Sequence, residues 1–288
     1  MKKFVVLLVA FLLVLPLAAC DQKPSDTGDT GGSPANTSGD EKAVEKVAYQ
    51  YYQEALAKQD AATSMVMDIA YDVKLELNGQ NMGTSMNGSM EMLTGVTPEN
   101  SQIHMLANMA IPTLGDVDSE IWFKDGWMYM DMMGMKLKQS ASAEDVFQQQ
   151  GAGKSITFGE DAIVNQEITD TADGGKKLTF LLDGAKMTEY TETLLKSMKE
   201  AGGEDVAVDL STVNVTETLD AEGNVTGIIM DFSATMVVAD QEVSSTYYMD
   251  MSNIKLNTLT SIEFPSDLEE YADTGSLGAS TDTSNLDI

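Results

Sequence analysis

The sequence predicts an α+β fold in which helices cover one face of a large, strongly curved antiparallel sheet. One block of strand patterns runs from residue 67 to 138, and a second runs from residue 162 to 264. Helical patterns precede the first block and separate the two blocks, without a regular alternation of strand and helix. This order favours helices on one face of an antiparallel sheet over a parallel α/β sheet.

The N-terminal segment has the layout of a secretory signal. Lys2 and Lys3 precede an apolar run from Phe4 to Leu17, which is shorter than the roughly 20 residues that span a bilayer. Two alanines follow, and then Cys20, the single cysteine of the chain. A lone cysteine excludes an internal disulfide and calls for another explanation. The alternatives are a lipid-attachment site and an ordinary signal with an incidental cysteine.

The remaining chain divides by composition. Residues 1–19 form the signal, and Cys20 begins a segment, residues 20–40, that is rich in Gly, Ser, Thr and Asp. Such a segment predicts a flexible tether with a reach of about 25 Å. We expect a single domain over residues 41–273 and a disordered, acidic tail over residues 274–288.

The chain is strongly acidic, with a formal net charge of -29 at pH 7. Its 17 basic residues are all lysines, so it lacks the arginine guanidinium, which binds a phosphate group through two parallel hydrogen bonds. We therefore expect no nucleic-acid partner. An anionic membrane surface would repel this domain, so a lipid on Cys20 has to provide any attachment to the membrane.

The first predicted element of the domain is a helix over residues 41–61, which Ser38 or Asp40 can cap. Its apolar residues fall at the 3 and 4 spacing of one helix face, and we expect that face to lie on the sheet. The residues of this face are Val44, Val47, Ala48, Tyr51, Tyr52, Ala55 and Leu56.

The next residues predict a meander of five strands. Every odd residue from Met67 to Leu77 is apolar and the intervening positions are mostly polar, as in a strand with one wet face. Asn78-Gly79 has the chemistry of a hairpin turn. The meander continues with a return strand through Met82, Met86, Met90 and Met92, a strand from Ile103 to Ile111, a turn at Asp116–Asp118, a short strand at Ile121–Phe123, a tight connection at Lys124–Gly126, and one strand from Trp127 to Lys138.

The second half is predicted in the same way. Short helices are expected at residues 143–150 and 187–199, and strands at 162–171, 177–182, 213–219, 225–238, 243–256 and 259–264. Pro265 ends the last of these strands.

Three motifs point toward catalysis or ligand binding, and each has a simpler interpretation. Gly151–Ser155 lacks the earlier glycine and the preceding strand of a phosphate-binding loop. Asp220–Asn224 lacks the spacing of a calcium loop and lies between two strands, which favours a hairpin turn. His104, the only histidine, is out of phase with Ile103 and Met105 and is expected on the solvent side. We therefore expect no enzyme, no cofactor and no metal.

Methionine is unusually abundant, with 20 residues, several of them between Met128 and Met135. Thioether sulfurs select Cu(I) and His104 could add an imidazole, but metal clusters normally contain several histidines or cysteines. Methionine side chains also adapt to irregular apolar ligands. The third interpretation is an ordinary methionine-rich core.

Taken together, these features resemble the Firmicutes-type lipoproteins of unknown function that share a LolA/LppX-like fold. The resemblance rests on Cys20 and its small neighbours, the tether, the long helix, the methionine-rich strand at Trp127–Lys136 and the closing Ile262–Pro265 strand. It implies cleavage before Cys20, a diacylglycerol thioether on that cysteine, and a place on the extracytoplasmic face of the cell membrane. It also implies an incomplete barrel, in which the curved sheet wraps around helices, and a cavity between them that holds lipid or acyl chains.

The sequence therefore favours a non-enzymatic, lipid-anchored domain that binds a lipid or another apolar ligand. An error of one position in strand phase would turn a lining residue outward. The candidate lining residues are Tyr71, Met105, Phe123, Trp127, Met230 and Tyr247. The alternative is a structural or interaction lipoprotein of the cell envelope, without a small ligand, marked by an exposed apolar patch instead of a cavity.

Overall fold

The computed structural model describes residues 46–77, 80–81, 83–95, 100–111, 115–142, 157–187, 207–238 and 241–276. The expected signal, Cys20, the tether and the helix expected at residues 143–150 lie outside these ranges. So do the Gly151–Ser155 motif, residues 277–288 and all but the first residue of the helix expected at 187–199.

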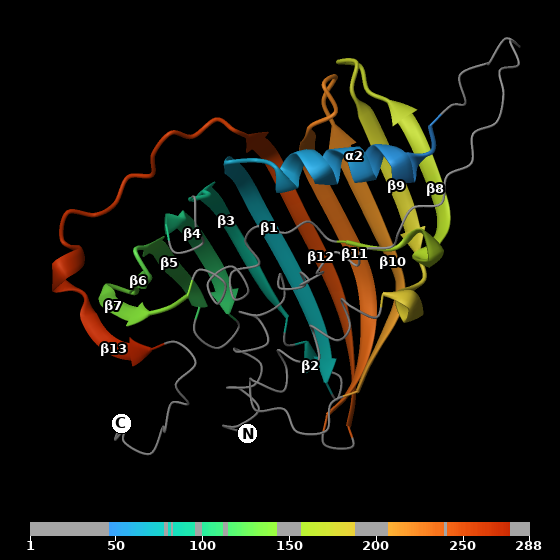
Figure 1. Ribbon diagram of the computed structural model, residues 1–288. Coiled ribbons are helices and arrows are strands. Elements are labelled where there is room, and N and C mark those ends of the chain that lie inside the picture. The colour runs from blue at the N-terminus through green and yellow to red at the C-terminus, as the bar shows by residue number, and fades with distance from the viewer. Residues whose placement is uncertain are drawn as a thin grey trace, which may run out of the picture.

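A single sheet of thirteen strands organises the described residues (Figure 1). Its strand order is β13-β7-β6-β5-β4-β3-β1-β12-β11-β10-β9-β8, with β2 paired to β1. All neighbours are antiparallel except β13, which runs parallel to β7. The strands are β1 (Ser64–Leu77), β2 (Gln80–Asn81), β3 (Thr84–Leu93), β4 (Gln102–Ile111), β5 (Gly115–Lys124), β6 (Trp127–Met132), β7 (Met135–Ser140), β8 (Ile163–Asp170), β9 (Lys176–Leu182), β10 (Ala207–Leu219), β11 (Val225–Val238), β12 (Gln241–Leu256) and β13 (Ala272–Ser276).

The two predicted strand blocks merge into this one sheet because β1 pairs with β12. Their register runs from Met65 opposite Leu256 to Glu76 opposite Ser244, so the contact extends along nearly the whole of β1. Strand β1 also pairs with β3 over its first ten residues. The first and last long strands of the domain therefore form the centre of a curved, open sheet (Figure 1).

The expected α+β class, with helices packed over the sheet, is wrong. Helix α2 (Ala48–Asp60) is the one α-helix within the described residues, beside the short 3₁₀ turns η2 (Glu160–Ala162), η3 (Gly184–Lys186) and η4 (Leu268–Glu270). It crosses one end of the sheet and contacts β8, β9 and β11 (Figure 1). The described residues are nearly all sheet, and several strands are longer than expected: β5 begins at Gly115 instead of Ile121, and β10 begins at Ala207 instead of Val213.

The apolar face of α2 packs on the sheet as predicted. Tyr52 is 3% exposed, and its ring stacks on Phe158 at 4.4 Å and meets the edge of Phe180 at 5.8 Å. Ala48 and Ala55 are buried beside it, whereas Val47 precedes the helix and is exposed. We call the face of the sheet that α2 covers the inner face, and the opposite face the outer face.

The alternation in β1 is confirmed. Met67, Tyr71, Val73 and Leu75 are buried on the inner face, whereas Asp68 and Lys74 point outward and are exposed. The same phase holds across the pairing partners, because Met67 lies opposite Met90, and Tyr71 lies opposite Met86. This consistent phase assigns each strand residue to a face.

In the first block one expected turn is absent, and one turn was not expected. The expected turn at Asp116–Asp118 is part of β5, in which Val117 is 4% exposed and its acidic neighbours point outward. The expected single strand from Trp127 to Lys138 is a hairpin. Met133 and Gly134 have positive φ values of 53° and 77°, as a two-residue hairpin turn requires.

The strand expected at 259–264 is also wrong. Asn257 has a positive φ of 58°, and its amide donates to the Ser64 carbonyl at 2.8 Å, so the chain turns away after β12. Both edges of β12 are already paired, with β1 and β11. Residues 257–271, here called the crossover segment, therefore have no strand structure and lead past the strand ends into β13 (Figure 1). Residues 263–271 of this segment lie against the outer face of β4 to β7. Strand β13 ends at Ser276, three residues beyond the expected domain boundary.

Candidate functional site

Five of the six candidate lining residues share the inner face. Tyr71, Met249 and Met230 lie opposite one another across β1, β12 and β11. Tyr247 stacks on Phe232 at 4.6 Å. The five inner-face candidates are all buried, at 0–8% exposure: Tyr71, Met105, Phe123, Met230 and Tyr247.

The sixth candidate, Trp127, lies on the outer face, so its predicted orientation is wrong. Asp125 and Gly126 form a two-residue turn with positive φ values, which places Trp127 directly opposite Lys124. Two residues that pair across such a turn share a face, and Lys124 belongs to the outer face of β5. The Lys138 ammonium lies 5.7 Å from the Trp127 ring.

Methionines cover much of the inner face over β1, β3, β4 and β6. Near the middle of the sheet the inner positions of β3 and β4 hold small residues, Gly88 and Ala107, which lie opposite each other. The large apolar side chains around them are half-buried instead of fully buried, namely Ile69, Met86, Ile121, Met130 and Met251. In this part of the inner face, large apolar side chains reach solvent.

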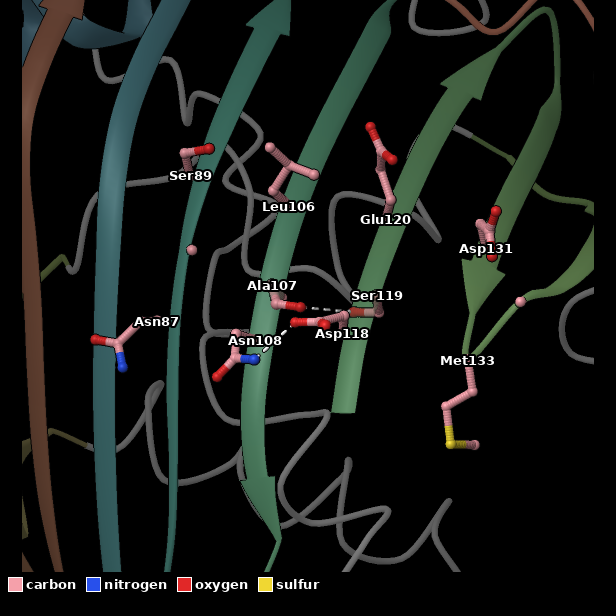
Figure 2. Close-up of a pocket in the computed structure, with 12 residues that line it drawn as sticks. Asn87, Ser89, Leu106, Ala107, Asn108, Asp118, Ser119, Glu120, Asp131 and Met133 are labelled. Atoms are coloured by element: carbon pink, nitrogen blue, oxygen red, sulfur yellow. Dashed lines mark hydrogen bonds between the residues drawn. The ribbon is translucent and has the colours of Figure 1, made fainter. Parts of the chain in front are cut away.

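The outer face of β3 to β6 holds an open groove of about 710 Å³ (Figure 2). Main-chain atoms of Gly88, Ala107 and Ser119 lie along it, and the Ser119 hydroxyl donates to the Ala107 carbonyl. Its other lining residues are Asn87, Ser89, Leu106, Asn108, Asp118, Glu120, Asp131, Met133 and Gly134. The groove thus combines three carboxylates with two exposed apolar side chains, Leu106 at 43% and Met133 at 63%.

His104 lies beside this groove and is held on both sides. Its Nε2 lies 2.8 Å from the Glu120 carboxylate and its Nδ1 lies 3.4 Å from that of Glu91. Its ring also stacks on Trp122 at 5.4 Å with an interplanar angle of 7°. The outer-face position expected for His104 is confirmed, and the two carboxylates and Trp122 fix its orientation there.

The crossover segment binds the neighbouring part of the outer face. Tyr271 is 3% exposed and meets the edges of Trp122 and Tyr129 at 6.4 and 5.6 Å. Asp267 forms an ion pair with Lys136, and this hydrogen bond lowers the pKa of Asp267 and raises that of Lys136. A second depression of about 450 Å³ lies between this segment and the sheet and shares Glu120 and Asp131 with the groove.

One buried acid lies on the inner face. Glu217 of β10 is 4% exposed and lies opposite Leu178 and Ile228. Burial raises the pKa of its carboxyl to about 8, because the charged form loses its hydration. The same carboxyl is close enough to Tyr52 of α2 to help raise the pKa of that phenol.

The arrangement separates the residues that a copper site would need. His104 is on the outer face, whereas Met90, Met105 and Met128 are buried on the inner face. Within the described ranges, no group of three or more His, Cys, Asp or Glu side chains is placed to hold a metal ion. Asp220–Asn224 is the hairpin turn that was expected, and the Asp220 carboxylate accepts hydrogen bonds from the amide and side chain of Asn224 at 2.8 and 3.0 Å.

The outer groove and the docked crossover segment were not predicted. A signal for the groove exists in Leu106, an apolar residue at an outward position between Met105 and Ala107. The crossover segment has a weaker signal in Tyr271, an aromatic residue beyond Pro265 and near the expected tail.

Comparisons with known proteins leave the family open. No family model matches the chain, and no curated protein matches it. A protein from Bacillus subtilis, YwiB, is 8% identical over 66% of this chain and 93% of its own, with a TM-score of 0.20. A DUF1329 family protein from Desulfovibrio piger is 9% identical over 74% and 93%, with a TM-score of 0.25.

A third solved structure is a β-barrel-like protein of the domain of unknown function DUF1849 from Brucella abortus. It is 8% identical over 68% of this chain and 99% of its own, with a TM-score of 0.19. TM-scores this low carry no argument about fold or function. The resemblance to Firmicutes-type lipoproteins therefore stays a prediction. Among the helices of the described residues, none has both the length and the apolar content to cross a membrane.

Proposed function

We propose that this protein is a lipid-anchored, extracytoplasmic, non-enzymatic domain that binds a lipid or another apolar ligand on its inner face. The observation that carries the proposal is the group of half-buried apolar side chains around Gly88 and Ala107. These residues, Ile69, Met86, Ile121, Met130 and Met251, lie on five strands, β1, β3, β5, β6 and β12.

Methionine chemistry supports this choice of ligand. Met86 and Met130 are unbranched, polarizable and able to change rotamer, so they can close on an acyl chain and close again after it leaves. The buried candidates Met105 and Phe123 lie next to this group, and their packing in the core would support it from below. Anchoring through Cys20 would hold such a domain near its source of lipid, since a stable membrane position needs more than weak surface attraction.

Native mass spectrometry tests the proposal. The full chain is purified from a membrane extract in mild detergent, and any bound molecule is released by organic extraction. We expect a co-purifying lipid with the wild-type protein and none with a variant that carries Met86→Glu and Met130→Glu. Both positions are half-buried, so the charges enter the proposed contact surface without entering the fully buried core.

The matched control adds the same charge on the outer face, with Leu106→Glu and Met133→Glu at side chains that are 43% and 63% exposed. The control variant has the same added charge and should keep the lipid. A clean wild-type mass under gentle conditions, or equal loss of lipid in both variants, contradicts binding at the inner face. A wild-type-like circular dichroism spectrum is required of both variants.

The second candidate function is that of an interaction lipoprotein without a small ligand. The exposed side chains of Leu106 and Met133 in the outer groove favour it, since exposed apolar groups beside a groove mark binding surfaces. This candidate predicts an apo mass in the same experiment.

A further inference from the structure

We infer that the outer groove is a docking site for an extended, lysine- or arginine-bearing segment of a partner protein. This inference does not depend on the apolar ligand proposed above, because it uses the opposite face of the sheet. It rests on the shape of the groove, its charge, and the segment of this chain that already binds beside it.

The shape fits an extended chain. The groove crosses β3, β4, β5 and β6, which at the usual spacing of strands span about 14 Å, the length of four or five extended residues. Figure 2 shows Ser89, Leu106 and Glu120 standing along one side of it and Asn87, Asn108 and Asp118 along the other. Gly88 keeps β3 and β4 close, because a Cβ atom there would meet the Leu106 carbonyl oxygen at 2.1 Å.

The charge selects a cationic occupant. Asp118, Glu120 and Asp131 line the groove, and none of its described lining residues is basic. The carboxylates of Asp118 and Glu120 are already oriented, by Asn108 at 2.7 Å and by His104 at 2.8 Å. Oriented carboxylates bind ammonium and guanidinium groups without losing further side-chain entropy.

The apolar residues select a peptide over a small cation. Leu106 and Met133 expose large apolar side chains on opposite sides of the acidic cluster, with Leu106 on β4 and Met133 at the turn after β6. An extended segment places successive side chains on opposite sides. A segment that alternates basic and apolar residues can therefore contact both kinds of groups at once.

The crossover segment shows that the neighbouring part of this face binds a segment of chain that is not a strand of the sheet. It lies over the neighbouring positions of β5 to β7, with Tyr271 against Trp122 and Asp267 paired to Lys136. The depression along it shares Glu120 and Asp131 with the groove, so the two surfaces are continuous. The crossover segment pairs the acid Asp267 with Lys136 at its site, whereas the charged residues that line the open groove next to it are all acidic.

Titration of the full chain with a fluorescent eight-residue peptide of alternating lysine and leucine tests the inference. The comparison peptide replaces each lysine with glutamate. We expect saturable binding of the lysine peptide and no binding of the glutamate peptide. We expect affinity to fall at least about tenfold with Asp118→Asn, Glu120→Gln and Asp131→Asn combined, as for several oriented ion pairs lost together.

A matched variant separates this site from general attraction to an acidic protein. Asp209→Asn, Glu222→Gln and Asp231→Asn remove the same charge from exposed positions of the β10–β11 region. Asp231 accepts a hydrogen bond from Asn214 at 2.9 Å, so this variant also loses a carboxylate oriented in the way that Asn108 orients Asp118. It should change affinity less than about twofold, since distant exposed charges are screened by salt.

A third variant, Leu106→Asn with Met133→Asn, tests the apolar contacts; asparagine tolerates the positive φ at position 133. We expect it to weaken the peptide severalfold and to leave spermidine binding unchanged. Equal losses with the two charge variants, or spermidine binding as tight as the peptide, would overturn the inference. A vesicle of anionic lipid that competed with the peptide would overturn it as well. All variants have to keep the wild-type denaturation midpoint.

Discussion

The two faces of the same strands, β3 to β6, differ in burial and in polarity. On the inner face, Ile103, Phe123 and Met128 are 0–2% exposed and form part of the main core. On the outer face of the same strands, Leu106 is 43% exposed and Glu120 lines an open groove. The inner side chains determine the register, because a shift of one residue would expose all of them.

The outer face is itself divided. Toward β7 the crossover segment buries Trp122 at 4% exposure, whereas toward β3 the groove stays open. The burial of Trp122 therefore comes from a segment more than a hundred residues later in the chain, and that of Phe123 from its own sheet face. Each experiment below perturbs one of these regions and uses another as its reference.

The largest effect is expected from Phe123→Ala. The side chain is fully buried on the inner face, so its removal leaves a cavity and should lower the free energy of unfolding by about 3–5 kcal/mol. The reference is Leu106→Ala on the outer face, which should change it by no more than about 0.5 kcal/mol. Equilibrium denaturation in urea measures both. Equal losses at the two positions would contradict the assignment of faces.

A smaller, pH-dependent effect is expected from Glu217. Its pKa is raised from 4.5 to about 8 in the folded protein, so the folded state holds a proton that the unfolded state has released between these values. The free energy of unfolding should therefore fall progressively as the pH rises from 4.5 to 8. We expect a total decrease of about 3 kcal/mol, which is less than the full shift would give, because the protein around the ionised carboxylate relaxes.

Urea denaturation of Glu217→Gln at a series of pH values measures this term. The variant should lose the part of the pH dependence between pH 4.5 and 8 that Glu217 causes, while the background from the other carboxylates remains. The exposed Glu222→Gln on the adjoining turn should keep the wild-type profile. Identical slopes for wild type and Glu217→Gln would show that Glu217 is ionised in the folded protein.

Much of the strand pattern could be predicted, because alternation is a local signal. β1, β4 and β11 follow the predicted odd or even phase closely. The fold class failed at turns with weak signals. Met133-Gly134 lacks the Asn-Gly or Asp-Gly pair that usually marks a hairpin, and Asp116 and Asp118 resemble a turn although they are the outward residues of a strand.

The candidate site was predictable only where phase is continuous. Tyr71 and Met230 each lie within a long alternating run, so their shared face follows from the sequence alone. Trp127 comes directly after a two-residue turn, across which the odd and even positions exchange faces, as Phe123 opposite Met128 shows. The outer groove combines residues from four strands, and its extent depends on register and on where the crossover segment lies. Neither is a local property of the sequence.

The smallest expected effect concerns the boundary between the covered and open parts of the outer face. Asp267→Asn removes the ion pair with Lys136 but leaves Tyr271 packed on Trp122 and Tyr129. Both side chains are about one third exposed, and a pair in contact with solvent contributes little. Cleavage of residues 257–271 by a protease should therefore quicken by less than about fivefold, without a change in the denaturation midpoint. Glu269→Gln, at an exposed position in the same segment, should leave the cleavage rate unchanged. High salt should bring the wild-type rate to that of Asp267→Asn, because salt screens the pair. Complete release of the segment in Asp267→Asn would show that the ion pair holds residues 257–271, and that the contacts of Tyr271 with Trp122 and Tyr129 do not. A single ion pair would then decide whether this part of the outer face is covered or open.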